Sequence, residues 1–248
     1  MYRFFVNPEQ INDKRVIIQG TDFNHIKNVL RMKEGEEVNI SNGIDDCDYR
    51  CGIVEFTEDS VVLEVRFIKK ESHELPSRIY LFQGLPKGDK MESIIQKNIE
   101  LGVFEIIPVE MKRCVVRLDD KKAESKVKRW QGIAEAAAKQ SKRGVIPKVL
   151  MPMSYKEALK YAKDNCTVKL LPYEMADGMG HTRDLINSIN KGESIGVFIG
   201  PEGGFDDSEV LAATEQGFET ITLGKRILRT ETAGMTVMSV LAFNLEED

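Results

Sequence analysis

The sequence predicts an α/β protein in which a small β-rich module precedes a domain built on a parallel sheet. In the later part of the chain, short apolar runs alternate with amphipathic helical segments, which is typical of a parallel sheet covered by helices on both faces. The earlier part instead has short strand-like runs with turn signals between them, such as Asn42 and Gly43, which predict hairpins. A polar stretch at 71–76 separates the two patterns, so we expect domains at 1–72 and 76–248.

The composition is that of an ordinary globular chain. Hydrophobic residues at 42% and charged residues at 30% exclude the disordered classes, and 248 residues suit one or two domains. No apolar run approaches the ~20 residues of a membrane span. The first residues lack the apolar core of a signal peptide, so we expect a cytoplasmic protein.

The cysteine and histidine positions argue against a metal centre. Cys47, Cys51, Cys114 and Cys166 are scattered, and the only close pair has a spacing that zinc sites do not use. The three histidines also lie far apart in the sequence. We therefore expect reduced thiols and no bound metal.

The sequence predicts five strands and one helix in the first module. Apolar runs between turn signals predict the strands at 2–6, 15–18, 37–41, 49–56 and 61–68. Thr21 or Asp22 is the predicted N-cap of the helix. Four apolar residues lie along one side of this helix: Phe23, Ile26, Val29 and Leu30.

The second domain alternates strands with helices. Short apolar runs predict strands at 78–83, 104–109, 167–171, 194–199 and 220–223. Helical spacing of apolar residues predicts helices at about 89–102, 123–141, 154–162, 182–190, 206–217 and 232–245. Asp89 with Glu92, and Asp206 with Glu209, fit capping boxes at the starts of two of these helices.

Two loops, 199–205 and 223–234, organise this domain. Each follows a predicted strand and opens a helix, so both lie beyond the carboxyl ends of a parallel sheet, where such sheets bind ligands. Gly200, Gly203 and Gly204 allow a sharp turn, and without a Cβ they let main-chain groups approach a ligand. Either loop alone also fits an ordinary glycine turn.

Together the two loops resemble the motifs of a known enzyme superfamily. Ile-Gly-Pro-Glu-Gly-Gly-Phe at 199–205 and Leu-Gly-x-Arg-Ile-Leu-Arg-Thr-Glu-Thr-Ala at 223–233 are similar to the knot-forming motifs of the SPOUT methyltransferases. Within that superfamily the chain resembles the RsmE family, from Arg3-Phe4-Phe5-Val6 to Thr232-Ala233. The resemblance implies a parallel-sheet SPOUT domain with a deep C-terminal trefoil knot, preceded by an RNA-binding PUA-like β-barrel at 1–72.

The resemblance also implies an activity, namely S-adenosylmethionine-dependent methylation of uridine N3 in 16S ribosomal RNA, at a uridine of the decoding region. Apolar walls and main-chain groups of the loops would hold the donor. The residues implied are Leu171, Pro172, Gly200, Pro201, Glu202, Gly203, Leu223, Gly224, Ile227, Leu228 and Thr232. The ribose-methylating SPOUT branch carries Ser-Leu-Asn where this chain has Arg-Ile-Leu-Arg at 226–229, which favours a base as the target.

The charge distribution favours a nucleic-acid partner despite a net charge of −5. Residues 110–148 hold twelve Lys or Arg against five Asp or Glu, so this basic block carries +7 and the remainder −12. Arg113, Arg129 and Arg143 lie in the basic block and look like the family's RNA-facing arginines. A solvated helix face is the alternative.

The first module is acidic overall, so any RNA contact there must be local. Five residues could form one basic edge: Arg3, His25, Lys27, Arg31 and Lys33. Of these, Arg3, His25 and Arg31 are the predicted RNA ligands, although His25 also fits an ordinary surface or core position on its helix.

Methylation at uridine N3 poses an acid–base problem. The pKa of this nitrogen is near that of a phenol, about 10. At pH 7 its deprotonation is therefore unfavourable by ~3 pH units, or ~4 kcal/mol. A carboxylate base and a cation near the uracil oxygens can supply this amount. Glu202 and Glu174 are the candidate bases, and Arg229 is the candidate cation. Two ordinary roles stay open, because Glu202 could bind main-chain N–H groups of its own loop and Arg229 could pair with Glu231.

Other functions also fit the sequence. A non-catalytic ribosome-binding or assembly module would keep the basic block but bind no donor, and a SPOUT methyltransferase could act on another RNA. The glycine loops could also form an anion-binding nest for phosphate. For any of these, the apolar last helix, with Met and Leu on more than one side, predicts a homodimer.

Overall fold

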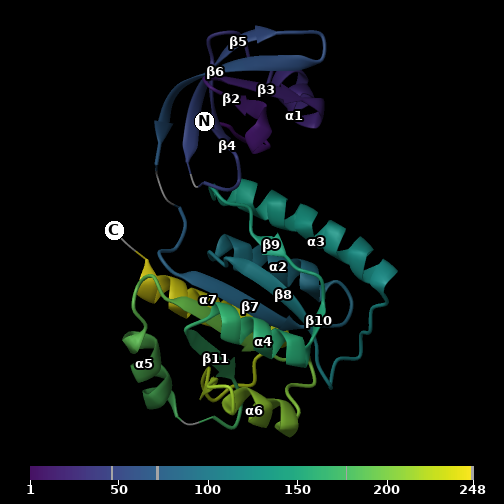
Figure 1. The fold of residues 1–248 in the computed structure, drawn as a ribbon, viewed down its shortest axis with the longest axis vertical. Helices are drawn as coiled ribbons and strands as arrows, with labels where there is room; N and C mark the ends of the chain where they lie inside the picture. Colours follow the sequence, from purple (N-terminus) through teal and green to yellow (C-terminus); the bar gives the residue numbers. More distant parts are fainter. Residues whose placement is uncertain (46, 71–72, 177, 247–248) are drawn as a thin grey trace. The chain divides into compact units, whose positions relative to one another are not determined.

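The computed structural model describes residues 1–45, 47–70, 73–176 and 178–246, drawn as a ribbon in Figure 1. The chain forms two compact units, which are 1–74 with 138–146 (unit 1) and 75–137 with 147–248 (unit 2). Residues 138–146, expected in the second domain, therefore belong to unit 1. Residues 71 and 72, where the predicted boundary begins, lie outside the described residues, and the single division at 72–76 stays a prediction.

Unit 1 is a six-stranded sheet around one apolar core. The strand order is β1 (Arg3–Phe5), β4 (Glu37–Ser41), β5 (Asp48–Phe56), β6 (Ser60–Lys69), β3 (Arg15–Gln19) and β2 (Ile11–Asn12). β1 pairs in parallel with β4, and the other neighbours pair antiparallel. The five predicted strands are confirmed. The two-residue β2 and the 3-10 turn before it, Pro8–Gln10, were missed because they are too short to show periodicity.

The helical segment after β3 differs from its prediction. α1 (Gly20–Asn24) continues as one π-helical turn, His25–Val29, and its N-cap is Gln19 rather than Thr21 or Asp22. Leu30 N donates to His25 O at 2.9 Å, an i→i+5 bond that widens the turn. A regular helix would place Val29 beside the fully buried Ile26, but the wider turn leaves Val29 64% exposed.

Unit 2 is built on a parallel sheet. Its strand order is β10 (Met153–Ser154), β8 (Glu105–Glu110), β7 (Arg78–Gly84), β12 (Ser194–Ile199), β11 (Val168–Pro172) and β13 (Glu219–Ile221), and β9 (Lys148–Val149) pairs with β8. Every pairing in this sheet is parallel, as predicted. In the central strand β7, each residue from Ile79 to Gly84 is buried, because both faces of the strand are covered.

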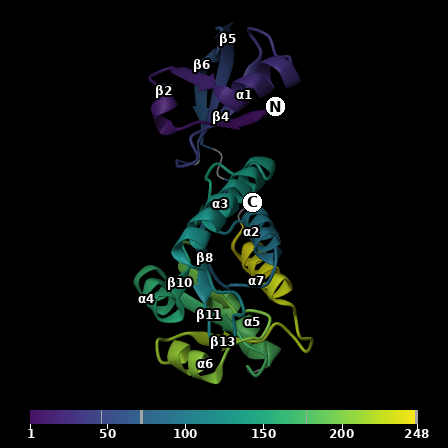
Figure 2. The same ribbon diagram turned by 90° about the vertical axis from the view of Figure 1, so that its right-hand side faces the viewer.

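Helices cover both faces of this sheet. They are α2 (Lys90–Glu100), α3 (Asp120–Gln140), α4 (Tyr155–Asn165), α5 (Met179–Ser188), α6 (Asp207–Thr214) and α7 (Thr230–Leu245). α2 and α7 pack together on one face, and α4 lies on the other (Figure 2). No helix in the described part of the chain is long and apolar enough to cross a membrane.

The order of the strands determines where a ligand can bind. β7 and β12 are central neighbours, stacked through Phe82 and Phe198 with ring centroids 4.3 Å apart. β8, which follows β7 in the chain, lies on one side of this pair, and β13, which follows β12, lies on the other side beyond β11. Such a reversal leaves a crevice beyond the carboxyl ends of the strands, since the connections diverge there.

Candidate active site

A cavity of about 710 Å³ lies at this crevice in unit 2. Its walls come from residues 199–205 after β12, residues 222–230 before and at the start of α7, and residues 172–174 after β11. Lys90, Arg113, Asp207 and Ala233 complete the lining. The volume lies within the range of small-molecule sites.

Most of the predicted donor-binding residues lie around this cavity. Nine line it: Pro172, Gly200, Pro201, Glu202, Gly203, Leu223, Gly224, Ile227 and Leu228. The other two do not. Leu171 is fully buried within β11, and Thr232 lies in the first turn of α7 outside the lining.

The first glycine loop is held close against its neighbours. A Cβ on Gly200 would lie 3.1 Å from the carbonyl carbon of Gly204, and one on Gly203 would lie 3.1 Å from the Cβ of Arg113. These approaches are tighter than ordinary side-chain contacts, so a side chain at either position would force its neighbour to shift. Arg113 also donates from Nη1 to Gly203 O at 3.1 Å, which ties the loop to the segment after β8.

A capping box fixes the end of this loop, as predicted. Asp206 accepts a hydrogen bond from Ser208 N at 3.2 Å, and Glu209 accepts one from Asp206 N at 2.9 Å. The Ser208 hydroxyl and then Lys112 lower the pKa of Asp206 to about 2. At the start of α2, Asp89 is also the N-cap, but its side chain makes no capping hydrogen bond.

The second loop depends on two threonines that the sequence did not single out. Thr222 accepts from Gly224 N at 3.3 Å, and Thr182 on α5 accepts from Thr222 N at 3.0 Å. This pairing holds Gly224 at φ +108°, in the region that favours glycine. A Cβ added to Gly224 would meet no atom within 4 Å, and Gly224 lines the cavity.

Glu202 is held by the segment after β7, outside its own loop, through a main-chain N–H group and a lysine that was missed. Its Oε1 accepts from Lys87 N and from Lys90 Nζ, both at 3.0 Å, and Lys90 Nζ also lies 3.5 Å from Glu231 Oε2. Burial alone would raise the pKa of Glu202, but the main-chain hydrogen bonds and Lys90 outweigh it and lower the pKa. The hydrogen bond that Lys90 donates to Glu202 is the main cause that raises the pKa of Lys90 above its ordinary value.

The Lys90–Glu202 pair therefore stays ionised across the neutral range. The stability contributed by Glu202, whose pKa is lowered, is present above its unfolded pKa and is lost as the pH falls through the lower folded value. The stability contributed by Lys90, whose pKa is raised, is lost only as the pH rises through that raised value, on the alkaline side of the neutral range. Because its pKa is lowered, the carboxylate of Glu202 is a weak proton acceptor.

Glu174 and Arg229 lie at the exposed edge of the same cavity. Arg229 is the N-cap of α7, with extended backbone at φ −67° and ψ 154°. Glu231, its possible ion-pair partner, faces Lys90 instead. Within the described residues neither Glu174 nor Arg229 has an ion pair, and both side chains are exposed.

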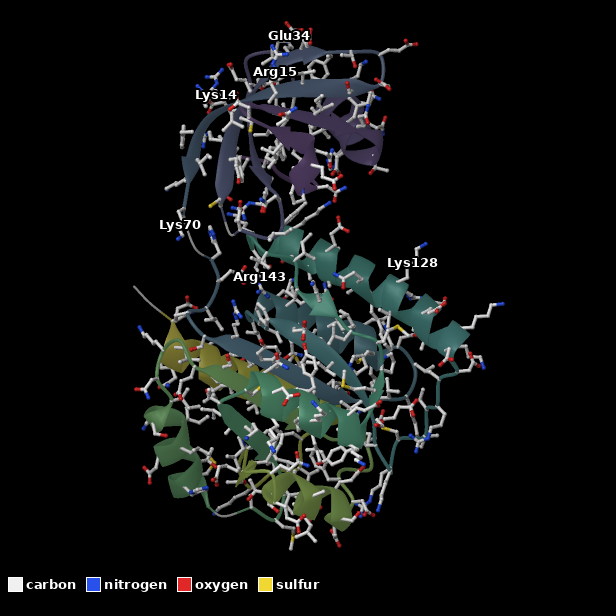
Figure 3. The ribbon with its side chains drawn as sticks, viewed as in Figure 1. Lys14, Arg15, Glu34, Lys70, Lys128 and Arg143 are labelled. Atoms are coloured by element: carbon white, nitrogen blue, oxygen red, sulfur yellow. The ribbon has the colours of Figure 1, made fainter. Side chains whose placement is uncertain are left out.

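The predicted RNA-facing residues divide into exposed and buried groups. Arg113, Arg129, His25 and Arg31 are exposed. Arg129 pairs with Glu92 at 2.9 Å but keeps 61% of its side chain exposed, and Lys128 extends outward from the same helix (Figure 3). The ring of His25 lies 6.0 Å from that of Phe4, in an edge-on contact at the surface.

Arg143 and Arg3, in contrast, bind protein groups within unit 1. The side chain of Arg143, labelled in Figure 3, is 3% exposed, and its Nε donates to both carboxylate oxygens of Glu74 at 3.1 Å. Arg3 pairs with Asp48 at 2.6 Å and donates to Arg143 O at 3.0 Å. No local pattern predicts these pairings, because each joins residues far apart along the chain.

We expect Arg143→Ala to lower the free energy of unfolding of the protein by ~2–3 kcal/mol, because it leaves Glu74 without its cation. Arg129→Ala should change stability by less than ~0.5 kcal/mol, since its ion pair is exposed, but should weaken RNA binding and flatten its salt dependence. Urea unfolding and RNA titration at several salt concentrations measure both effects. Parent-like stability in Arg143→Ala, together with a flatter salt slope, would contradict this division of roles.

Comparisons with known proteins agree with this arrangement. An RNA methyltransferase domain family matches residues 73–242, and an RNA methyltransferase PUA domain family matches residues 18–65. The chain is 39% identical to ribosomal RNA small subunit methyltransferase E of Bacillus subtilis over 254 residues, which cover 99% of this chain and 98% of that relative.

Two similar solved structures contain a bound donor. Ribosomal RNA small subunit methyltransferase E from Neisseria gonorrhoeae, bound to S-adenosyl methionine, has a TM-score of 0.83 and 32% identity, covering 98% of this chain and 97% of that one. A methyltransferase from Legionella pneumophila in complex with the cofactor SAM has a TM-score of 0.81 and 31% identity, covering 96% of each chain. The predicted α/β SPOUT fold with a PUA domain is confirmed, and the knot stays a prediction. The chain therefore belongs to the RsmE family of RNA methyltransferases.

Proposed function

We propose that this protein transfers a methyl group from S-adenosylmethionine to N3 of a uridine in 16S ribosomal RNA, in the decoding region of the small subunit. The cavity at the carboxyl ends of the parallel strands supports the proposal, because nine predicted donor-binding residues line it. The full-length relative from Bacillus subtilis is named as a ribosomal RNA methyltransferase, and the similar Neisseria protein is bound to the donor. Since ribosomal RNA is the substrate, we place the reaction in the cytoplasm.

The residues around the cavity suit S-adenosylmethionine. Pro172, Ile227 and Leu228 offer apolar surface for an adenine ring, and main-chain groups of Gly200 and Gly224 border the same space. Gly224 leaves open the volume that a Cβ would occupy. Bound there, S-adenosylmethionine would supply an electrophilic methyl group.

We propose that Glu174 is the base that accepts the proton of uridine N3. Glu202 is already engaged by Lys87 and Lys90, and its pKa is lowered, so it is the weaker of the two candidate bases. Glu174 is exposed at the edge of the cavity and has no ion pair among the described residues. Arg229 would stabilise the charge that develops on the uracil oxygens as the proton leaves.

The target base must be unstacked to enter this site, so the surrounding RNA has to be held. We propose that Arg113 and Arg129, with the exposed lysines of α3, contact its phosphates, and that His25 and Arg31 contribute from the PUA-like domain at 1–72. Arg3 and Arg143 instead organise unit 1 through Asp48 and Glu74.

We also propose that the C-terminal part of the SPOUT domain, 76–248, forms the deep trefoil knot of the family. The start of α7 lies against the loop after β12, since the Thr230 hydroxyl donates to Gly200 O at 2.6 Å. The loops at 200–205 and 222–229 also border one cavity. An experimental trace of the chain from 165 to 245 tests whether the last segment passes through a loop.

We expect a homodimer of twice the 28.1 kDa chain mass. α7 exposes Phe243 (90%) and Val240 (46%), three residues apart on one side of the helix, and a second copy would cover this apolar surface. Light scattering at micromolar concentration measures the mass, and Phe243→Glu should shift it toward the monomer. Leu211→Glu is the matched control, because Leu211 is a 60% exposed apolar residue of α6. A monomeric parent protein would contradict the proposal.

Two measurements test the proposed function. Calorimetry with S-adenosylhomocysteine should show one site per chain, whereas a non-catalytic assembly module would bind none. Mass mapping of 16S ribosomal RNA from cells with and without the gene should show one N3-methyluridine that depends on the gene. Donor binding without that change in 16S ribosomal RNA would indicate another RNA substrate.

A further inference from the structure

A buried amide lies directly behind the cavity. Gln83, near the carboxyl end of β7, is fully buried and lies opposite Ile199 of β12. Its Nε2 donates to Gly84 O at 3.0 Å and to Thr230 Oγ1 at 2.8 Å. An amide nitrogen has two hydrogens and accepts none, so both hydrogens are used and the orientation of the amide is fixed.

This orientation also fixes the hydroxyl of Thr230. Because Thr230 Oγ1 accepts from Gln83, its own hydrogen is available for another acceptor, and it donates to Gly200 O at 2.6 Å. Thr230 is 5% exposed, so water does not compete strongly for these bonds. One hydroxyl therefore joins the end of β7, the loop after β12 and the start of α7.

The hydrogen bonds from Gln83 to Thr230 and from Thr230 to Gly200 form a relay. This relay acts on two groups that border the cavity. Gly200 is part of the wall formed by the first glycine loop. Arg229 directly precedes Thr230, and its carbonyl accepts from Thr232 N at 2.9 Å and Ala233 N at 2.8 Å. The position of Thr230 thus sets the first turn of α7 and the backbone from which the Arg229 side chain extends.

The amide at position 83 has a cost for the stability of the fold. Gln83 Oε1 is buried without a hydrogen-bond donor among the described residues. A buried acceptor without a partner is destabilising, and an apolar side chain of the same size would avoid it. The two donated bonds are what the amide provides, and the one to Thr230 acts at the edge of the cavity, because Thr230 lines it.

We infer that Gln83 is a positioning residue of the methyltransferase site, which acts through Thr230 on Gly200 and Arg229 and contacts neither the donor nor the target base. The inference rests on the proposed function and deepens it. In this inference the buried side chain of Gln83, 147 positions before Thr230 in the sequence, determines where the loop at Gly200 and the candidate cation Arg229 lie.

Two single variants and their combination test the relay. Gln83→Met keeps the length of the side chain but removes its donors, and Thr230→Val keeps the shape but removes the hydroxyl. Each should weaken S-adenosylhomocysteine binding about tenfold and lower kcat at saturating donor, since a buried hydrogen bond is lost at the site. The double variant should be no worse than either single variant, because the relay is already broken. Thr230→Ser, which keeps the hydroxyl, should lie between the parent and Thr230→Val.

Asn98→Leu is the matched control. Asn98 is also a fully buried amide, but its Nδ2 donates to Ile94 O at 2.7 Å within its own helix. This variant should change Tm while donor affinity and kcat remain those of the parent. A Gln83→Met protein with parent donor affinity and parent kcat would overturn the inference, whatever its Tm. If Gln83→Met does not fold, Thr230→Val decides the same question.

The outcomes separate this inference from the proposed function. A parent protein that binds no S-adenosylhomocysteine would contradict the proposed function itself. A parent that binds the donor, together with Gln83→Met and Thr230→Val variants that bind it equally well, would contradict only the positioning role of Gln83.

Discussion

Gly224→Val should weaken binding of S-adenosylhomocysteine at least about 100-fold while leaving the protein folded. At φ +108° a β-branched residue is strained by ~1–3 kcal/mol, and the resulting shift of the loop would move the main-chain groups that border the cavity. The side chain would also extend into the space left open beside Gly224. Since each 1.4 kcal/mol is tenfold in affinity, strain and steric exclusion together account for an effect of this size.

Gly192→Val is the matched control for this variant. Gly192 has φ +89°, meets no atom within 4 Å at its Cβ position and lies in the loop that precedes β12. That loop lies at the amino end of β12, whereas the cavity lies beyond its carboxyl end. We expect a similar loss of Tm in the two variants but parent donor affinity in Gly192→Val. Equal affinity in Gly224→Val and the parent would place the donor elsewhere.

Glu174→Gln should lower kcat about 100-fold to 1,000-fold at pH 7 while the binding constants for donor and RNA stay unchanged. Glutamine keeps the size of the side chain but cannot accept the N3 proton. The rate of the variant should recover as the pH approaches ~10, where N3 ionises into solvent without a base. The Lys90–Glu202 pair does not cause this recovery, because the hydrogen bond to Glu202 raises the pKa of Lys90 and so opposes the loss of its charge. Single-turnover rates from pH 6 to 10 measure the profile.

Two further variants distinguish the groups around the proton. Glu202→Gln should weaken donor binding, because it breaks the contacts with Lys87 and Lys90 that hold the loop. Arg229→Lys should keep part of the activity, since a point charge still stabilises the uracil oxyanion but lacks the planar fork. Full activity at pH 7 in both Glu→Gln variants would show that the field of Arg229 ionises N3 and that water takes the proton.

Local patterns predicted the longer strands and the two loops that border the cavity, and the resemblance to the RsmE family implied many of the individual lining residues. A short β-branched apolar run followed by glycines, such as 194–199, favours a buried strand, and Gly204 takes the positive φ that the turn after this strand requires. The capping box of Asp206 and Glu209 spans three residues, so it too can be read locally. These features depend on neighbours in the sequence, which explains why they were predictable.

The side chains that hold the cavity in place depend on distant partners instead. Lys90 meets Glu202, and Gln83 meets Thr230, across more than 100 positions, and neither pairing leaves a periodic signal. For Arg143 a local pattern was present but misleading. It lies in a run of positive charge that predicts solvent exposure, but Glu74 neutralises it in a buried pair that only the folded chain brings together.

Unit 1 is discontinuous in the sequence, and this has a consequence for biosynthesis. Its first 74 residues leave the ribosome well before 138–146, which bring the carbonyl of Gly144 to Ser41 and the guanidinium of Arg143 to Glu74. At ~5–20 residues per second the delay is roughly 4–14 seconds. During that time the nascent chain carries a β-sheet that lacks the contacts of Gly144 and Arg143, and it is open to chaperones and proteases. A fragment that ends at residue 74 would keep this defect permanently, so unit 1 can be isolated only with 138–146 joined to it.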